Sequence, residues 1–93
     1  RLLELRIHRQ FGHRLGEVAW SIVQHYVGAS VTVTDDEIRA AQRLLWDRLR
    51  LVAEPGGATA LAALHSGAYT PEPGERVVVV VCGSNCDPAT VVG

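Results

Sequence analysis

A run of five consecutive valines, Val77–Val81, is the strongest constraint on the fold of this 93-residue chain. Valine is β-branched and is enriched in strands. A strand with one face in water alternates apolar and polar residues, whereas a parallel strand covered on both faces is continuously apolar. The run therefore predicts a strand over residues 76–81, buried in a parallel sheet between layers of helices.

The rest of the chain alternates between strand-like and helical periodicity. Residues 1–8 alternate apolar and polar side chains, which predicts a short strand. Apolar residues then recur at helical spacing from Leu15 to Tyr26, and Gly28 is placed to end that helix. The remaining predicted elements are strands at residues 29–33 and 51–53 and helices at residues 34–50 and 58–64, the last capped by Gly67.

The helix predicted over residues 34–50 has the clearest start signal. Thr34 and Glu37 have the spacing of a capping box, in which each side chain accepts a hydrogen bond from the backbone amide of the other residue. Its arginines are typical of a solvated face. The predicted buried stripe consists of Ile38, Ala41, Leu45 and Leu49.

This order of elements predicts an α/β fold of alternating helices and short parallel strands, arranged as a partial three-layer α/β/α unit. In an open parallel sheet, ligands bind beyond the carboxyl ends of the strands. One predicted strand is followed by Glu54-Pro-Gly-Gly57 and another by Cys82-Gly-Ser-Asn85. We therefore expect Glu54 and Cys82 at one edge of the sheet, next to glycines that let a ligand approach the backbone.

Each of these residues also has an ordinary structural explanation. A cysteine at a strand end is more often a small buried hydrophobic residue than a functional group. A glutamate before a proline more often starts a helix, and a pair of glycines is usually a turn. Their expected meeting at one edge is what favours a binding site.

Composition argues against several classes of function. The net charge of −1 argues against binding to nucleic acid or to an anionic membrane surface, and no apolar run is long enough to span a membrane. The spacing of Cys82 and Cys86, without a histidine near them in sequence, argues against a metal site or a disulfide. A reducing cytoplasm is therefore the expected location. The chain also has no lysine, so chemistry that needs a side-chain amine cannot come from it alone.

Three motifs, taken in order, resemble the end of the catalytic domain of pyridoxal-phosphate-dependent threonine and serine dehydratases. They are Val31–Ile38, Leu51–Leu64 and Val77–Asp87. The resemblance implies the tryptophan-synthase-β-like fold, known as fold type II, which serine racemase shares. It divides the chain into an unmatched segment, residues 1–14, and residues 15–93, the C-terminal part of an incomplete catalytic domain.

The resemblance implies a role for Cys82. In this family, a serine or cysteine at this position donates a hydrogen bond to the pyridine nitrogen of pyridoxal 5'-phosphate. The family motif is Ser-Gly-Gly-Asn or Cys-Gly-Gly-Ser-Asn, and here it is Cys82-Gly83-Ser84-Asn85, with serine in place of a second glycine. Near neutral pH a thiol is mostly a neutral, weak donor, so it holds the ring nitrogen without fully protonating it. Such a weak electron sink suits β-elimination.

The other implied site residues support this contact. Gly83, Ser84 and Asn85 form the cofactor pocket next to Cys82. Glu54 is expected near the cofactor ring, and Gly56 and Gly57 are expected to allow close packing there. The resemblance implies no metal ligand and no catalytic residue within this chain.

The resemblance also implies what must come from elsewhere. The family's Schiff-base lysine, its glycine-rich phosphate loop and its substrate-carboxylate loop belong to segments upstream of the matching part. We therefore expect no dehydratase activity from this chain alone. The complete enzyme is expected to be a homo-oligomer that converts L-threonine or L-serine into a 2-oxo acid and ammonia. Two alternatives stay open, a non-catalytic remnant or binding module of the same fold and an enzyme similar to serine racemase.

Overall fold

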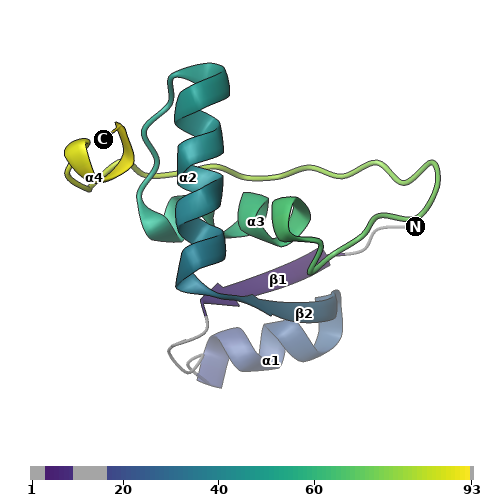
Figure 1. The fold of residues 1–93 in the computed structure, drawn as a ribbon. Helices are drawn as coiled ribbons and strands as arrows, with labels where there is room; N and C mark the ends of the chain where they lie inside the picture. Colours follow the sequence, from purple (N-terminus) through teal and green to yellow (C-terminus); the bar gives the residue numbers. More distant parts are fainter. Residues whose placement is uncertain (1–3, 10–16, 93) are drawn as a thin grey trace.

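The computed structural model describes residues 4–9 and 17–92 and forms three layers around a small parallel sheet. Helix α1 lies on one side of the sheet, α3 lies on the other side, and α2 packs against α3 (Figure 1). This arrangement confirms the predicted partial α/β unit. In chain order the elements are β1 (Glu4–Arg9), α1 (Glu17–Tyr26), β2 (Val27–Val33), α2 (Asp35–Leu49), α3 (Pro55–Ser66) and α4 (Ala89–Val92).

The sheet consists of β1 and β2, which pair in parallel from Leu5 opposite Ala29 to Arg9 opposite Val33. The strands predicted at residues 1–8 and 29–33 are therefore confirmed for the described residues, since residues 1–3 lie outside them. Gly28 was expected to end a helix, but it lies within β2. The chain passes directly from Tyr26 into the sheet because Val27 already pairs with Glu4.

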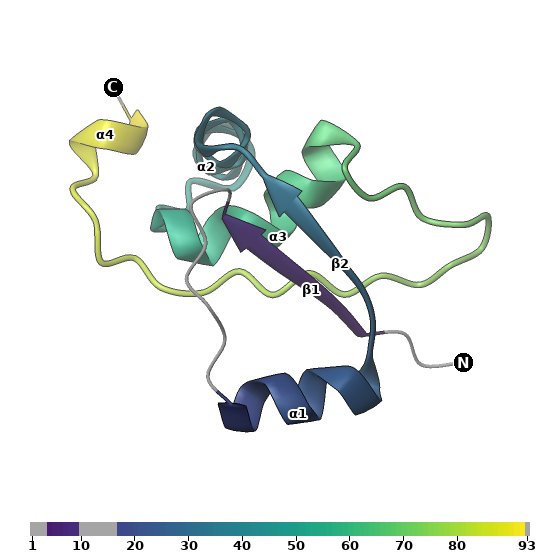
Figure 2. The same cartoon turned by 90° about the horizontal axis from the view of Figure 1, so that it is seen from below.

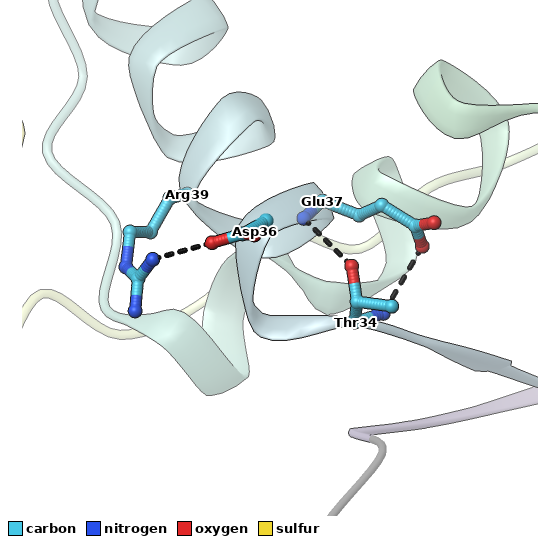
Figure 3. A network of polar contacts seen from close by, with 4 residues as sticks. All are labelled: Thr34, Asp36, Glu37 and Arg39. Atoms are coloured by element: carbon cyan, nitrogen blue, oxygen red, sulfur yellow. Dashed lines mark hydrogen bonds and ion pairs between the residues drawn. The ribbon is translucent and has the colours of Figure 1, made fainter.

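Helix α2 begins with the predicted capping box (Figure 3). The amide of Glu37 donates to Thr34 Oγ1 over 3.1 Å, and the amide of Thr34 donates to Glu37 Oε2 over 3.0 Å. The helix ends at Leu49 and is capped by Arg50, which adopts the left-handed conformation (φ 55°) and donates its amide to the carbonyl of Trp46. The guanidinium of Arg50 lies 5.2 Å from the centre of the Trp46 ring.

The core forms where α2 crosses α3 above the end of β2. Three of the four predicted stripe residues of α2 are buried, but Leu49 is 63% exposed, because the last turn of α2 extends past α3 (Figure 1). The small side chains of α3 allow the two helices to approach closely. The core cluster consists of Val33, Ile38, Ala41, Leu45, Ala53, Ala58, Ala62 and Ala63.

The predicted valine strand is not formed in this structure. Residues 76–81 run as an extended trace from the loop after α3 toward α4 (Figure 2), and Val78 and Val80 are 89% and 67% exposed. A strand needs a neighbour to accept its backbone hydrogen bonds. In the described part of the chain, β1 and β2 pair with each other, and residues 76–81 make no backbone hydrogen bond.

Two further predictions after α2 need correction. Residues 51–53 are not a strand, since only a short connection separates the left-handed Arg50 from the next helix. That helix, α3, starts at Pro55 rather than at residue 58, consistent with the preference of proline for the first helical position. Its predicted cap is confirmed, because Gly67 has a φ of 82° and donates its amide to Leu64. The short helix α4 was not predicted.

Two described residues of the apolar face predicted for helix α1 are exposed. Val18 and Ile22, which belong to the expected apolar face, are 77% and 53% exposed, and Trp20 is 53% exposed. Only one neighbouring element in the described chain, β2, contacts this helix closely. None of the described helices has the length and apolar character needed to cross a membrane.

A side-chain contact closes the loop that leads from α3 to the valine run. The hydroxyl of Tyr69 donates a hydrogen bond to the carboxylate of Glu75. This hydrogen bond raises the pKa of Tyr69, and burial and the negative charges of Glu75 and Glu72 raise it further. The contact ties the start of the extended segment to the end of α3, because Tyr69 also packs against the core.

Replacing Thr34 with alanine tests the capping box. We expect Thr34→Ala to lower the free energy of unfolding by about 1 kcal/mol, because an amide at the start of α2 loses its acceptor. Thr70→Ala is the control, since Thr70 is exposed in a loop, and it should change stability by less than about 0.5 kcal/mol. Urea denaturation followed by circular dichroism measures both, and equal effects would contradict the assignment.

Candidate functional site

Two segments that are distant in sequence lie against each other at the start of α3. Glu54 precedes the helix in an extended conformation and donates its amide to the carbonyl of Gly83 over 3.0 Å. Cys82 donates its amide to the carbonyl of Gly57 over 3.3 Å. The expected proximity of Glu54 and Cys82 is confirmed, although neither residue follows a strand in this structure.

The contact is possible because glycine occupies both sides of it. A Cβ atom at Gly57 would lie closer than 3.0 Å to the carbonyl oxygen of Cys82, a separation that real Cβ atoms essentially never show. A Cβ at Gly83 would overlap the Glu54 side chain, and Gly83 has a φ of 77°, which disfavours other residues. The close backbone approach is therefore at Gly57, whereas a Cβ at Gly56 would meet nothing within 4 Å.

The polar groups of the second segment face the surroundings. Cys82, Ser84 and Asn85 are exposed, and Glu54 is half-buried beside Gly83. Both cysteines are free thiols. The Sγ of Cys86 is half-buried and lies 3.8 Å from the carbonyl oxygen of Ala53. The exposed thiol of Cys82 is therefore available as a hydrogen-bond donor next to the first turn of α3.

Sequence reasoning missed one residue that holds this arrangement. Gln42 lies on the buried side of α2, is 6% exposed, and donates from Nε2 to the carbonyl of Ala53 over 2.7 Å. Its position four residues after Ile38 was a usable signal, because that spacing places a polar side chain on the apolar stripe. Within the described residues, no group of three histidine, cysteine or acidic side chains is arranged to hold a metal ion.

The two adjacent glycines at the start of α3 give a matched test of the contact. Gly57→Ala should lower the free energy of unfolding by about 3 kcal/mol, because the new methyl group meets a backbone carbonyl that must move. Gly56→Ala should instead raise it by about 0.5 kcal/mol, because the site is open and alanine restricts the unfolded chain. Urea denaturation measures the difference, and effects of the same sign would contradict the described packing.

Comparison with known proteins gives a consistent set of relatives. The chain is 46% identical over 74 residues to phenylserine dehydratase of Ralstonia pickettii, a match that covers 80% of this chain and 23% of that enzyme. It is 38% identical over 76 residues to mouse (Mus musculus) serine racemase, covering 78% of this chain and 22% of the racemase. It is 37% identical over 75 residues to the biosynthetic L-threonine dehydratase of Pasteurella multocida, covering 77% of this chain and 14% of that enzyme.

The chain thus spans less than a quarter of the length of these curated relatives. The matching region also fits a family as a whole, described as "Pyridoxal-phosphate dependent enzyme", over residues 5–83. That match includes both segments of the candidate site up to Gly83 and begins ahead of Leu15. The chain belongs to the family of pyridoxal-phosphate-dependent enzymes.

Proposed function

We propose that this chain forms the ring-nitrogen side of the cofactor pocket in a dehydratase that acts on a small 3-hydroxy amino acid, such as L-threonine or L-serine. The observation that supports the proposal is the contact between the first turn of α3 and Cys82-Gly83. Through this contact, an exposed thiol and a half-buried carboxylate from distant segments lie beside one another. Both are residues that the family resemblance assigns to the surroundings of the cofactor ring.

The residues present fit one side of pyridoxal phosphate. The thiol of Cys82, the hydroxyl of Ser84 and the amide of Asn85 are exposed groups that can donate hydrogen bonds to a heteroaromatic ring and its substituents. Open space around Gly56 leaves room for a planar group near the backbone. The chain has no lysine, so the cofactor aldehyde must be held by other residues of the complete protein.

In this proposal Cys82 sets the strength of the electron sink. The bound cofactor supplies a sink for the electron pair left when the substrate loses its α-proton. A neutral thiol donates a weak hydrogen bond to the ring nitrogen and does not fully protonate it. A ring nitrogen held in this way would favour loss of the β-hydroxyl group from the substrate, which is the outcome that a dehydratase needs. Ser84, Asn85 and Glu54 support the pocket around this contact.

The substrate class is proposed from the relatives. Phenylserine dehydratase, beta-hydroxyaspartate dehydratase and L-threonine dehydratase are each named for an amino acid that carries a β-hydroxyl group. The weak electron sink proposed at Cys82 would suit the loss of such a hydroxyl group. The homo-oligomeric state of the complete enzyme and its cytoplasmic location remain predictions.

We expect the 93-residue chain to have no activity by itself. Pyridoxal phosphate and L-threonine or L-serine would be added to the purified chain, and 2-oxo acid formation would be followed by reaction with a hydrazine reagent. No turnover above that of the free cofactor is expected, because the chain has no side-chain amine to bind the aldehyde. Robust turnover would contradict the proposal that a lysine comes from elsewhere.

A chimaera tests the proposed role of Cys82. The matching 74 residues of the Ralstonia pickettii phenylserine dehydratase would be replaced by those of this chain. In this chimaera Cys82→Ala should lower kcat by about 3- to 10-fold, the worth of one neutral hydrogen bond, and should change the absorption spectrum of the bound cofactor. Cys82→Ser is the matched control and should keep both properties close to those of the parent chimaera. An unchanged kcat and spectrum in Cys82→Ala would exclude the proposed contact.

An enzyme similar to serine racemase is the second candidate, supported by the 38% identity to the mouse enzyme. The coding DNA upstream of this chain tests whether the complete protein is an enzyme or a non-catalytic remnant. An open reading frame that encodes a lysine segment and a glycine-rich loop supports an enzyme, whereas a stop codon supports a remnant. Incubation of the complete protein with L-serine then separates the two enzymes, since a dehydratase forms pyruvate and a racemase forms D-serine.

A further inference from the structure

We propose that Gln42 is a positioning residue for the cofactor site, acting through the carbonyl group of Ala53. This inference rests on the proposed function for its catalytic meaning, but its structural part stands on the contacts of the chain itself. Gln42 is on α2 and belongs to none of the motifs of the candidate site. Within the described residues, the hydrogen bond to Ala53 links its side chain to the site.

The carbonyl of Ala53 is held from two directions. Ala53 is 1% exposed, so its carbonyl group needs a partner within the protein. Gln42 Nε2 donates to it over 2.7 Å from α2, and the thiol of Cys86 approaches it to 3.8 Å from the opposite segment. A thiol is a weak donor, so Gln42 provides the principal hydrogen bond.

Ala53 is the residue immediately before Glu54, so its placement determines where the site begins. Glu54 donates its amide to Gly83, and the following turn carries Gly57, whose carbonyl accepts from Cys82. A displacement of the Ala53 peptide would therefore move the amide on which Gly83 docks. The backbone of Gly57 lies so close to the carbonyl of Cys82 that no Cβ atom fits between them. Even a small displacement of this backbone therefore loosens the contact with Cys82.

The polarity of Gln42 is informative because packing alone does not require it. The residues of α2 that bury their side chains next to it are Ile38, Ala41 and Leu45, all apolar. Burying an amide without a hydrogen bond is unfavourable, whereas a methionine fills a similar volume without that penalty. A glutamine at this place is favourable only if it makes the bond to Ala53. We infer that this bond holds α2 to the site.

The structural part is tested on the full 93-residue chain by amide hydrogen exchange measured with NMR. Gln42→Met keeps the volume and removes the donor. The amides of Glu54 and Cys82, which make the docking hydrogen bonds, should exchange about tenfold faster or more relative to the amide of Leu45 within α2. If the exchange rates of the Glu54 and Cys82 amides relative to that of Leu45 do not change, the inference is overturned. This includes the case in which general destabilisation accelerates all three amides equally.

A matched variant separates positioning from the loss of any buried hydrogen bond. Thr59 is also 6% exposed, but its hydroxyl donates to Pro55 within its own helix. In Thr59→Val, the amide exchange rates of Glu54 and Cys82, each divided by that of Leu45, should therefore stay within about twofold of their values in the parent chain. A change in Thr59→Val as large as in Gln42→Met would also count against a specific role for Gln42.

The catalytic part is tested in the chimaera with the Ralstonia pickettii enzyme. Gln42→Met should change the absorption spectrum of the bound cofactor in the same direction as Cys82→Ala, and the double variant should show no further change. Independent, additive changes would overturn the positioning role. If the parent chimaera binds no cofactor, the proposed function fails, while the exchange ratio in the 93-residue chain still decides whether Gln42 positions Glu54 and Cys82.

Discussion

The structure depends on a close backbone contact at the start of α3. The segment of Cys82 and Gly83 lies so near to Glu54 and Gly57 that a methyl group on either glycine would overlap a neighbouring group. Two backbone hydrogen bonds of 3.0 and 3.3 Å form across this contact. Such bonds orient peptide groups more firmly than long side chains can, because the backbone has few soft dihedral angles. The relative placement of Glu54 and Cys82 follows from this constraint.

The helical layer supplies the rigidity that the contact needs. Helix α2 packs against α3 through alanines, and Gln42 adds a polar bond from the same face to Ala53. The sheet lies below this pair and contributes the end of β2 to the core. The site therefore lies at the start of α3, next to its packing against α2, whereas Val78 and Val80 are exposed.

Local signals explain which parts of the fold were predictable. The Thr34 and Glu37 capping box and the Gly67 cap depend on residues only a few positions apart, and both form as predicted. The prediction of a valine strand was wrong for a physical reason. Valines indicate apolar surroundings, but a strand also requires a hydrogen-bonding neighbour, and no local sequence pattern supplies one. For the site, the glycines after Glu54 and Cys82 indicated that a ligand could approach the backbone, whereas in the structure Gly57 and Gly83 let the two segments approach each other. Gly56 and Gly57 were both expected to allow close packing. That Gly57 alone of these two does so, and that Gln42 supports the contact, depends on how helices pack.

Residues 82 and 83 are docked through their backbone, so the position of the side chain at residue 82 does not depend on its chemistry. Cys82 is held through its amide, which donates to Gly57, and Gly83 through its carbonyl, which accepts from Glu54, so neither of these docking hydrogen bonds uses the thiol. A serine at position 82 would therefore occupy the same place and present a hydroxyl group instead. The family resemblance includes both residues at this position, and backbone docking gives a physical reason for that freedom. In the proposed function, either residue can then donate a hydrogen bond to the ring nitrogen without disturbing the pocket.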